Sequence, residues 1–378
     1  MDEKTRLLDT PLGDEVHRYA ESIVVIFKGR RNVVSTSVFN GGYREDLRFA
    51  YNNSCGRDKE QDCHKMKAAT LEGHYRVIAE ELRLDTDRST GMGTAALIEN
   101  MATVSKSHGP IAVSAMITAG VDVNGGRAGD PASYDELQKK SLLRTEISGT
   151  INMFLHINAR MPEGTLVRAL MTATEAKTAA LQELMANSCY SNGLATGSGT
   201  DSAIIIGNLD SDVYVRNAGK HCILGELIGV TVKEATKEAL DRQSGMNTIR
   251  QARASYQAKR FGITRENIAM YHKHMFADSK LDVNGFGEAF TKVDSNPELV
   301  AGFAAYIHLV DQYNWGLLDK RVVHDTCGSQ LGMLRKKLNL PSFRQHGKDS
   351  HKDMPERTFQ EVMIGPLIKT MAELIEKN

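Results

Sequence analysis

The chain has 378 residues, and its 47 Lys plus Arg balance its 47 Asp plus Glu, so the formal net charge is zero at neutral pH. This balance argues against a dedicated nucleic-acid binder and against a polybasic membrane protein. Hydrophobic residues make up 41% and charged residues 25%, which is ordinary for a soluble globular protein. The length predicts two domains, or one large domain with an appendage.

Five cysteines, at positions 55, 63, 189, 222 and 327, do not make a disulfide framework and indicate a reducing compartment. The N-terminus, MDEKTRLLDT, lacks the apolar core of a signal peptide, and no apolar run reaches the roughly 18–20 residues of a membrane span. We therefore expect a cytoplasmic protein. The spacing of Cys55, Cys63 and His64 fits no common zinc pattern, so we expect no metal site there.

Strand-like and helix-like patterns alternate along the first 245 residues. They predict a short helix at 14–22, strands at 23–27 and 33–38, a helix at 70–82, a helical segment within 89–105 and a strand at 111–119. The last of these, IAVSAMITA, carries no charge and should be buried on both faces. After the second strand, Asn40, Gly41 and Gly42 form a turn where the backbone can approach a ligand closely.

The loop GVDVNGGRAGDP at 120–131 concentrates Asn124, Arg127 and Asp130 around two glycines. An Arg beside glycines suits recognition of an anionic or carbonyl-bearing ligand. An Arg127–Asp130 pair that braces the loop fits the pattern equally well.

The stretch from Thr145 to Ser202 has the order strand, helix, glycine-rich loop, strand. Apolar residues alternate with polar ones over 150–157, which predicts a strand buried mainly on one face, with Thr150 and Asn152 side by side. Residues after Gly164 follow helical spacing, with one apolar stripe and a polar face that carries Thr172 and Glu175. The loop ATGSGTDS at 195–202 offers backbone N–H groups that bind phosphate or stabilise an oxyanion.

A helix is expected from about 224 to 243, and from residue 246 the pattern becomes mostly helical. The sequence thus predicts an α/β or α+β domain at 1–245 and a helical C-terminal extension at 246–378. The basic stretch 242–260 is typical of a solvated linker helix, although a phosphate-contacting helix would have the same charges. The segment 278–288 lacks the ligands of a calcium loop, because Lys280 stands at the first ligand position.

Six blocks of the chain resemble successive blocks of one enzyme family. In order they are VVSTSVFNGGYRE (33–45), ITAGVDVNGGRAGDP (117–131), GTINMFLHI (149–157), TLVRALMTATEAKTAALQEL (165–184), ATGSGTDS (195–202) and AGKHCILGELIG (218–229). Together they resemble the adenosylcobinamide amidohydrolases, the CbiZ family, over roughly residues 30–245. Residues after about 250 are poorly covered by this resemblance.

The resemblance implies a corrinoid-salvage enzyme. It would hydrolyse the amide that joins the aminopropanol arm of adenosylcobinamide to the ring's propionate, giving adenosylcobyric acid. No metal or redox cofactor of the protein itself is implied, because cobalt arrives with the substrate. The implied partner is adenosylcobinamide or a related corrinoid, with no nucleic acid and no membrane, and a homo-oligomer is compatible with this function.

The order of Gly149, Thr150, apolar strand, turn and long helix is also similar to the DmpA aminopeptidases and ornithine acetyltransferases, which implies an α+β layered sandwich. By that similarity Thr150 would be a nucleophile freed by self-cleavage. Without self-cleavage Thr150 would need another base, such as Lys177, His156 or a carboxylate. A water activated by Asp201 or Glu175 is the alternative.

The resemblance and the patterns together give an expected site. Its catalytic candidates are Thr150, Glu175, Asp201 and Lys177, and its substrate-binding candidates are Asn40, Gly41, Gly42, Asn124, Arg127, Asp130, Asn152, Thr172, Thr196, Gly197, Ser198 and Thr200. Among these, Asn152 or Asn40 would donate to the oxyanion. Two other functions stay open: a corrinoid-binding protein without chemistry, and a self-processing Thr-nucleophile peptidase or acyl hydrolase.

Overall fold

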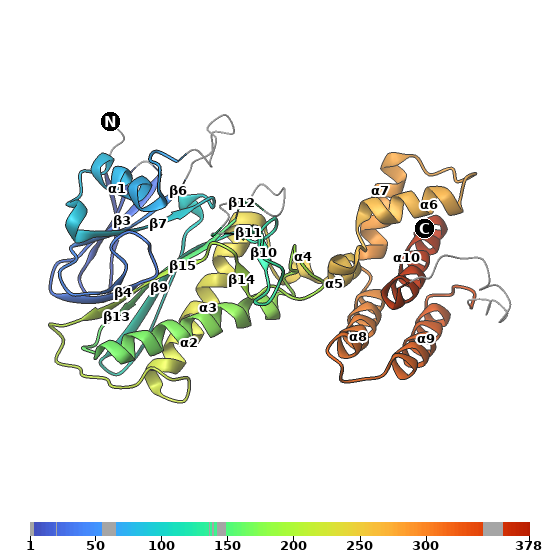
Figure 1. Cartoon of the computed structure of the whole chain (residues 1–378). Helices are drawn as coiled ribbons and strands as arrows, with labels where there is room; N and C mark the ends of the chain where they lie inside the picture. The colour runs from blue at the N-terminus through green and yellow to red at the C-terminus, as the bar shows by residue number, and fades with distance from the viewer. Residues whose placement is uncertain are drawn as a thin grey trace. The chain divides into compact units, whose positions relative to one another are not determined.

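The computed structural model describes residues 4–19, 21–54, 66–135, 137, 140–141, 149–342 and 358–378. Cys55, Cys63 and His64 lie outside these residues. The chain divides into two compact units, Met1–Asn247 and Thr248–Asn378, both drawn in Figure 1.

Unit 1 contains two main β-sheets. The first has five strands in the order β1 (Thr5–Asp9), β2 (Glu15–Tyr19), β3 (Ser22–Ile26), β6 (Phe49–Ser54) and β7 (Ser89–Thr94). The second has six strands in the order β5 (Gly42–Arg44), β4 (Arg31–Ser35), β15 (Ser202–Asn208), β13 (Ile151–Ile157), β9 (Ile111–Ala119) and β8 (Ala102–His108). Two short ribbons complete the set: β10 (Gly125–Gly126) with β14 (Gly197–Ser198), and β11 (Tyr134–Asp135) with β12 (Lys140–Ser141).

The helices of unit 1 cover the outer faces of these sheets (Figure 1). On the six-stranded sheet, α2 (Glu163–Glu183) and α3 (Ile223–Ser244) pack through one apolar cluster that includes Leu155 and Leu166. On the five-stranded sheet, α1 (Leu71–Glu81) packs through a smaller cluster with Ile78 and Tyr51. A third apolar cluster fills the space between the two sheets. The expected α+β layered fold with a helical C-terminal region is therefore confirmed.

Strand β13 is buried on both faces, whereas the alternation in its sequence predicted one buried face. All seven of its residues are buried, because the odd-numbered side chains meet the helices and the even-numbered ones meet the other sheet. Polar residues at even positions, such as Asn152 and His156, therefore lie between the sheets and not in solvent. Helix α2 joins β13 to β15, its parallel neighbour in the sheet.

Two expected helices are strands. Residues 14–22 contain β2, which pairs with β1 on one side and β3 on the other and buries Val16 in the core between the sheets. Segment 89–105 contains β7 and the start of β8. A Cβ atom at Gly91 would lie 2.1 Å from the Tyr51 ring, so this glycine allows the ring to pack against the strand. Pairing with neighbouring strands overrides the local pattern in both places.

Unit 2 is helical. Its helices are α4 (Thr248–Gln251), α5 (Ala254–Ala258), α6 (Arg265–Met275), α7 (Val283–Asp294), α8 (Pro297–Asn314), α9 (Lys320–Lys337) and α10 (Phe359–Lys377). They enclose an apolar core of their own, which includes Phe303, Leu331 and Leu367. Across the described residues of both units, no helix combines the length and the apolar character that crossing a bilayer requires.

Candidate functional site

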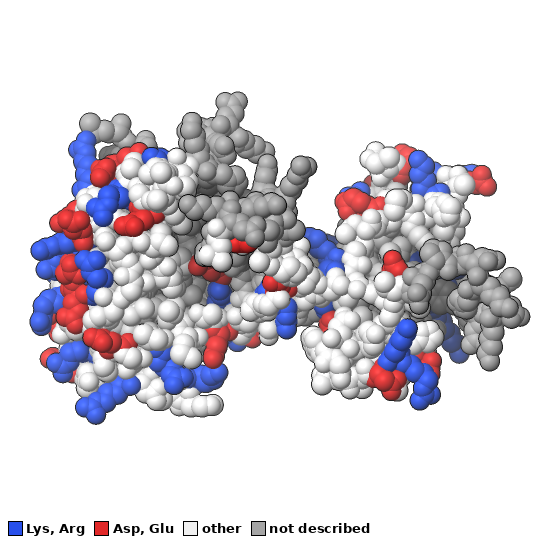
Figure 2. All heavy atoms as spheres, viewed as in Figure 1, with Lys and Arg blue, Asp and Glu red and all other residues white. Residues whose placement is uncertain are grey.

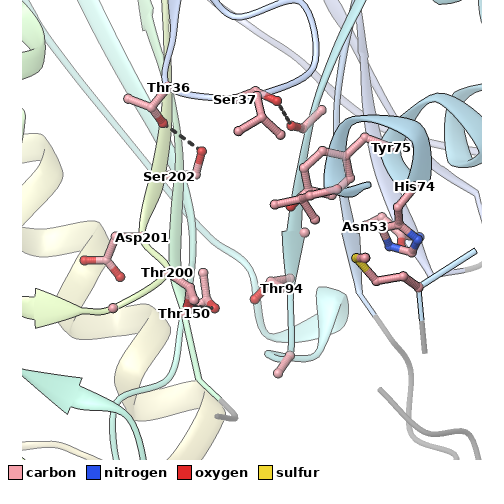
Figure 3. Close-up of a pocket in the computed structure, with 17 residues that line it drawn as sticks. Thr36, Ser37, Asn53, His74, Tyr75, Thr94, Thr150, Thr200, Asp201 and Ser202 are labelled. Carbon is pink, nitrogen blue, oxygen red and sulfur yellow. Dashed lines mark hydrogen bonds between the residues drawn. The ribbon is translucent and has the colours of Figure 1, made fainter. Parts of the chain in front are cut away.

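Unit 1 contains a pocket of about 510 Å³, a volume that suits a small-molecule ligand (Figure 3). It lies where the ends of β4 and β7 meet the beginnings of β13 and β15. Its described lining comes from both sheets, from α1 and from the loop before β15: Thr36, Ser37, Val38, Asn53, Met66, Leu71, His74, Tyr75, Gly91, Gly93, Thr94, Ala95, Thr150, Gly199, Thr200, Asp201 and Ser202.

One wall of the pocket is rich in hydroxyl groups. Thr150 stands immediately before β13, and its Oγ1 lies 2.7 Å from Oγ1 of Thr200. Thr36 directly follows β4 and Ser202 begins the neighbouring strand β15, and their hydroxyl oxygens are 2.8 Å apart (Figure 3). Ser37 donates its hydroxyl to the Gly91 carbonyl at 2.5 Å and so links this wall to β7.

Asp201 organises the loop behind Thr150. Its Oδ1 accepts the Ile151 N–H at 2.9 Å and the Ser198 hydroxyl at 2.6 Å. Its Oδ2 accepts the Ser198 N–H at 3.0 Å and is bound by the Lys177 ammonium group of α2. The carboxylate therefore has four donors, and it fixes the start of β13 to the glycine loop.

Gly197 makes room for this ion pair. A Cβ atom there would lie 2.3 Å from Asp201 Oδ2 and 2.7 Å from Lys177 Nζ. Any side chain at this position would push the pair apart. Gly197 of ATGSGTDS thus serves a close approach to an ion pair, a use that the loop pattern alone did not distinguish from phosphate binding.

Other residues of the lining are apolar or aromatic. Val38, Met66 and Leu71 expose 57%, 47% and 44% of their surfaces, which is unusual for large apolar side chains grouped around one pocket. Tyr75 lies beside them, and burial raises the pKa of its hydroxyl above the ordinary value. A ligand of this pocket would meet both hydroxyl groups and apolar side chains.

His74 adds a hydrogen-bond donor to the lining (Figure 3). Its Nδ1 faces the backbone N–H of Lys67 at 3.1 Å, so Nδ1 is the acceptor and the proton of the neutral ring is on Nε2. Burial and the nearby Lys67 charge lower the pKa of His74 below its ordinary value. The ring is therefore neutral near pH 7, and its remaining nitrogen is a donor.

Asn152 lies beneath the floor of the pocket. Its amide group donates to the Asn52 side-chain oxygen at 2.8 Å and to the Gly93 carbonyl at 2.9 Å, so both of its protons are used. Asn52 in turn donates to Thr118 at 3.0 Å. Asn152 connects the two sheets, and in this arrangement it has no proton left for an oxyanion.

Asn40 and Gly41 belong to the turn between β4 and β5, Gly42 begins β5, and none of the three lines the pocket. Asn40 donates both amide protons, to the carbonyls of Thr86 and Ser89 at 2.7 Å each. A Cβ at Gly41 would lie 1.9 Å from the Ser37 carbonyl, and Gly42 has a φ of +79°. These three residues shape the loop that presents Thr36 and Ser37.

Glu175 and Thr172 are placed elsewhere on α2. Glu175 is exposed and forms an ion pair with Lys220, and it is not among the residues lining the pocket. Thr172 is buried and donates to the Ala218 carbonyl at 2.8 Å. Of the polar residues predicted on α2, the structure brings only Lys177 next to the pocket, through Asp201.

The loop 120–131 does not line the pocket, and hydrogen bonds stabilise it. Asp130 accepts the Arg127 N–H at 2.7 Å and the Ser188 hydroxyl at 2.6 Å, and the Arg127 side chain donates to the Leu194 carbonyl at 3.3 Å. Asp130 thus stabilises this loop through the Arg127 backbone N–H and the Ser188 hydroxyl. Two more predicted residues also make internal bonds: Asn124 donates to the Gly149 carbonyl at 2.8 Å, and Thr196 accepts the Ala128 N–H at 2.9 Å.

Several pocket residues were not predicted from the sequence. Thr36, Ser37 and Ser202 follow or begin apolar strands, and hydroxyl residues at strand ends are a signal that could have found them. His74 and Tyr75 lie on a helix whose pattern gave no such signal. They reach the pocket because α1 packs on β7, at the edge of the other sheet.

The family comparison agrees with the sequence blocks. The model of the family described as adenosylcobinamide amidohydrolase, CbiZ, matches residues 7–248. The uncharacterized protein MJ1613 of Methanocaldococcus jannaschii is 30% identical over 232 residues, which are 59% of this chain and 87% of that protein. The crystal structure of the PH0078 protein from Pyrococcus horikoshii OT3 is similar over 64% of this chain and 82% of that chain, with 13% identity and a TM-score of 0.30.

The family match covers more than half of the 378 residues and contains every residue that lines the pocket in unit 1. The chain therefore belongs to the adenosylcobinamide amidohydrolase (CbiZ) family.

Proposed function

We propose that unit 1 hydrolyses the amide between the aminopropanol arm of adenosylcobinamide and the ring's propionate, releasing adenosylcobyric acid. Family membership supports amide hydrolysis, and the pocket supports a substrate with two different faces. The polar arm would enter along the hydroxyl wall, while Val38, Met66 and Leu71 would contact the apolar rim of the large ring. The protein would act in the cytoplasm, and the cobalt would belong to the substrate.

The single observation that carries a mechanism is a series of hydroxyl groups from Thr150 to Asp201. Thr150 Oγ1 lies 2.7 Å from Thr200 Oγ1, which lies 3.4 Å from Ser198 Oγ, and Ser198 donates to Asp201 Oδ1 at 2.6 Å. A proton leaving Thr150 can pass along this series to the carboxylate. Amide hydrolysis needs such a base, because an un-ionised hydroxyl is a weak nucleophile.

In this mechanism Thr150 Oγ attacks the amide carbon, and its proton moves through Thr200 and Ser198 to Asp201. The C–N bond then breaks and the proton returns to the leaving amine, which departs as aminopropanol. Water hydrolyses the ester left on Thr150 and regenerates its hydroxyl. His74, with its proton on Nε2, would donate to an oxygen of the bound substrate.

The ion pair with Lys177 keeps this base in place on the loop behind Thr150. The relay would accept the proton as the attack proceeds and return it to the leaving amine. The roles of Ser198 and Thr200 would be proton transfer, beyond the substrate binding expected from the sequence.

The test is incubation of the purified full chain with adenosylcobinamide, followed by mass spectrometry of aminopropanol and adenosylcobyric acid. We expect turnover by the unaltered protein, loss of about 10³-fold or more in Thr150→Ala, and substantial recovery in Thr150→Ser, which restores a hydroxyl. Activity of Thr150→Ala within about tenfold of the unaltered protein would instead support a directly activated water.

Two measurements separate the other candidate functions. Tight binding of adenosylcobinamide without any turnover would identify a corrinoid-binding protein. An intact-mass measurement would detect self-processing, since cleavage before Thr150 would leave two chains, as expected for a self-processing peptidase or acyl hydrolase.

A further inference from the structure

The helical unit contains a pocket of its own, of about 410 Å³. It is lined by α5, by the turn that follows it, by the start of α6 and by the end of α7. Three of the lining side chains are cationic: Arg253, Lys259 and Arg265. Figure 2 shows Lys and Arg side chains gathered over α4 and α5. The basic stretch that resembled a solvated linker in the sequence therefore contributes two cations to one concave surface.

The three cations form no salt bridge among the described residues. In the part of unit 2 that the structure describes, salt bridges join other cations to carboxylates, such as Arg260 to Asp311 and Arg335 to Glu373, and none involves these three. Other polar residues of the unit thus satisfy one another, while the cations around the pocket keep their donors available. Arg and Lys donors that line one pocket and form no salt bridge are suited to an anion.

Two carboxylates also line the pocket, but both are occupied. Asp294 is 2% exposed and accepts the Ser255 N–H at 2.7 Å and the Ser255 hydroxyl at 2.9 Å, and its burial raises its pKa. Glu266 is in the first turn of α6, where hydrogen bonds from its own N–H and from Thr264 lower its pKa, with smaller effects from the charges of Arg265 and Lys259. Even with both ionised, three cations and two anions leave the pocket positive.

Aromatic rings hold two of the cations at the wall. Lys259 Nζ lies 5.6 Å from the centre of the Tyr256 ring, and the Arg265 guanidinium carbon lies 5.7 Å from the centre of the Phe290 ring. These are cation–π distances, which favour a fixed position for each charge. The rings and the buried Ile263 also give the pocket an apolar part beside its charged part.

We propose that this pocket binds the phosphate group of a phosphorylated organic molecule, with Arg253, Lys259 and Arg265 around the phosphate and Tyr256 and Phe290 against the organic part. A phosphate monoester carries close to two negative charges and three strong acceptor oxygens, which suits three separate cations, whereas a carboxylate carries a single charge. The site lies wholly in unit 2 and does not depend on the reaction proposed for unit 1.

The experiment is titration calorimetry of the full chain with phenyl phosphate, with inorganic phosphate and with phenol. We expect saturable binding of phenyl phosphate, weaker binding of inorganic phosphate and no binding of phenol. The double variant Lys259→Ala/Arg265→Ala should weaken phenyl phosphate binding at least about tenfold, since it removes two charge-assisted contacts. The matched control is Lys273→Ala, which removes an exposed cation of α6 that does not line the pocket.

The proposal is overturned by any of three results. One is no saturable binding of phenyl phosphate up to about 10 mM, which is weaker than a specific site would show. Another is equal weakening in Lys273→Ala, which would indicate non-specific attraction. The third is inorganic phosphate binding as tightly as phenyl phosphate, which would indicate a site for the free ion. Thermal unfolding of each variant shows whether it is folded, and Arg265→Lys, which keeps the charge, provides a second variant if the double variant is not.

Discussion

The Lys177 ammonium group binds the Asp201 carboxylate directly beside Gly197, where there is no space for a side chain. The two side chains are only 12% and 16% exposed, so water screens their attraction weakly. The same carboxylate fixes Ile151, next to Thr150. The position of the proposed nucleophile therefore depends on an ion pair that bridges a helix and a loop.

Substitution of Gly197 tests this dependence. We expect Gly197→Ala to lower the free energy of unfolding by about 1–3 kcal/mol, because the new Cβ would force the ion pair or the loop to move. Activity should fall more steeply than stability. Urea unfolding and the aminopropanol assay measure the two effects, and Gly164→Ala in α2 is the control, since a Cβ there meets no atom within 4 Å and the residue does not line the pocket. Equal behaviour of the two variants would contradict the role assigned to Gly197.

The ion pair can be broken without changing its shape. Asp201→Asn should destabilise the fold by about 2–4 kcal/mol, because it leaves the largely buried Lys177 charge without its counter-ion. The double variant Lys177→Met/Asp201→Asn should regain part of this stability but none of the activity, because the proton acceptor is still missing. Recovery of turnover in the double variant would exclude Asp201 as the base.

The hydroxyl series makes a separate prediction. Ser198→Ala interrupts the proton path while leaving Thr150 and Asp201 in the chain, and we expect kcat to fall by about 10²-fold with little change in KM. Thr36→Val is the control, because its hydroxyl faces Ser202 on the same wall but is outside the series. If both variants lose activity equally, the series does not carry the proton.

His156 predicts how stability depends on pH. Its ring lies fully buried between the sheets, both nitrogens lack a hydrogen-bond partner among the described residues, and burial together with the Arg31 charge lowers its pKa to about 3. The unfolded chain binds a proton near pH 6.5, whereas the folded protein resists protonation until about pH 3. The contribution of the neutral His156 ring to the free energy of unfolding is therefore complete above pH 6.5, and it is lost progressively as the pH falls toward 3.

The expected slope in this window is about 1.4 kcal/mol per pH unit from this one group. Urea unfolding of His156→Phe at about pH 7.5, 6 and 5 should show a flatter dependence than the unaltered protein. The exposed His108, replaced by Gln, is the control and should leave the slope unchanged. Identical slopes for the unaltered protein and His156→Phe would mean that the ring gains a proton partner in the folded state.

Much of the architecture could be predicted from the sequence because its periodicity is strong. The strand predicted from the uncharged run at 111–119 is β9, and the helix predicted from the spacing after Gly164 is α2. The errors at 14–22 and 89–105 share one cause: these segments are strands because of their neighbours in the sheet, and a linear pattern does not contain those neighbours.

The residues of the candidate site could be predicted from the sequence only where they lie close together along the chain. Gly197, Ser198, Thr200 and Asp201 lie within one loop, so their composition indicated a site. His74 and Tyr75 come from a helix about 75 residues before Thr150, on the other sheet, and only the packing of the two sheets brings them to the same pocket. The same packing places Glu175 on the solvent side of α2, which helical spacing alone could not decide.

The pairing of β13 with β15 aligns Asn152 with Ser202 in a parallel register. Thr150 and Thr200, each two residues earlier, are consequently neighbours because of strand alignment and not because of the loop itself. A deletion of one residue within β13 would turn Thr150 toward the helices, since successive side chains alternate between faces. Insertions between Leu184 and Asn192, after α2 and away from both strands, would preserve that alignment. The lengths of β13 and β15 are therefore constrained in natural and engineered variants, whereas the segment between Leu184 and Asn192 can change in length.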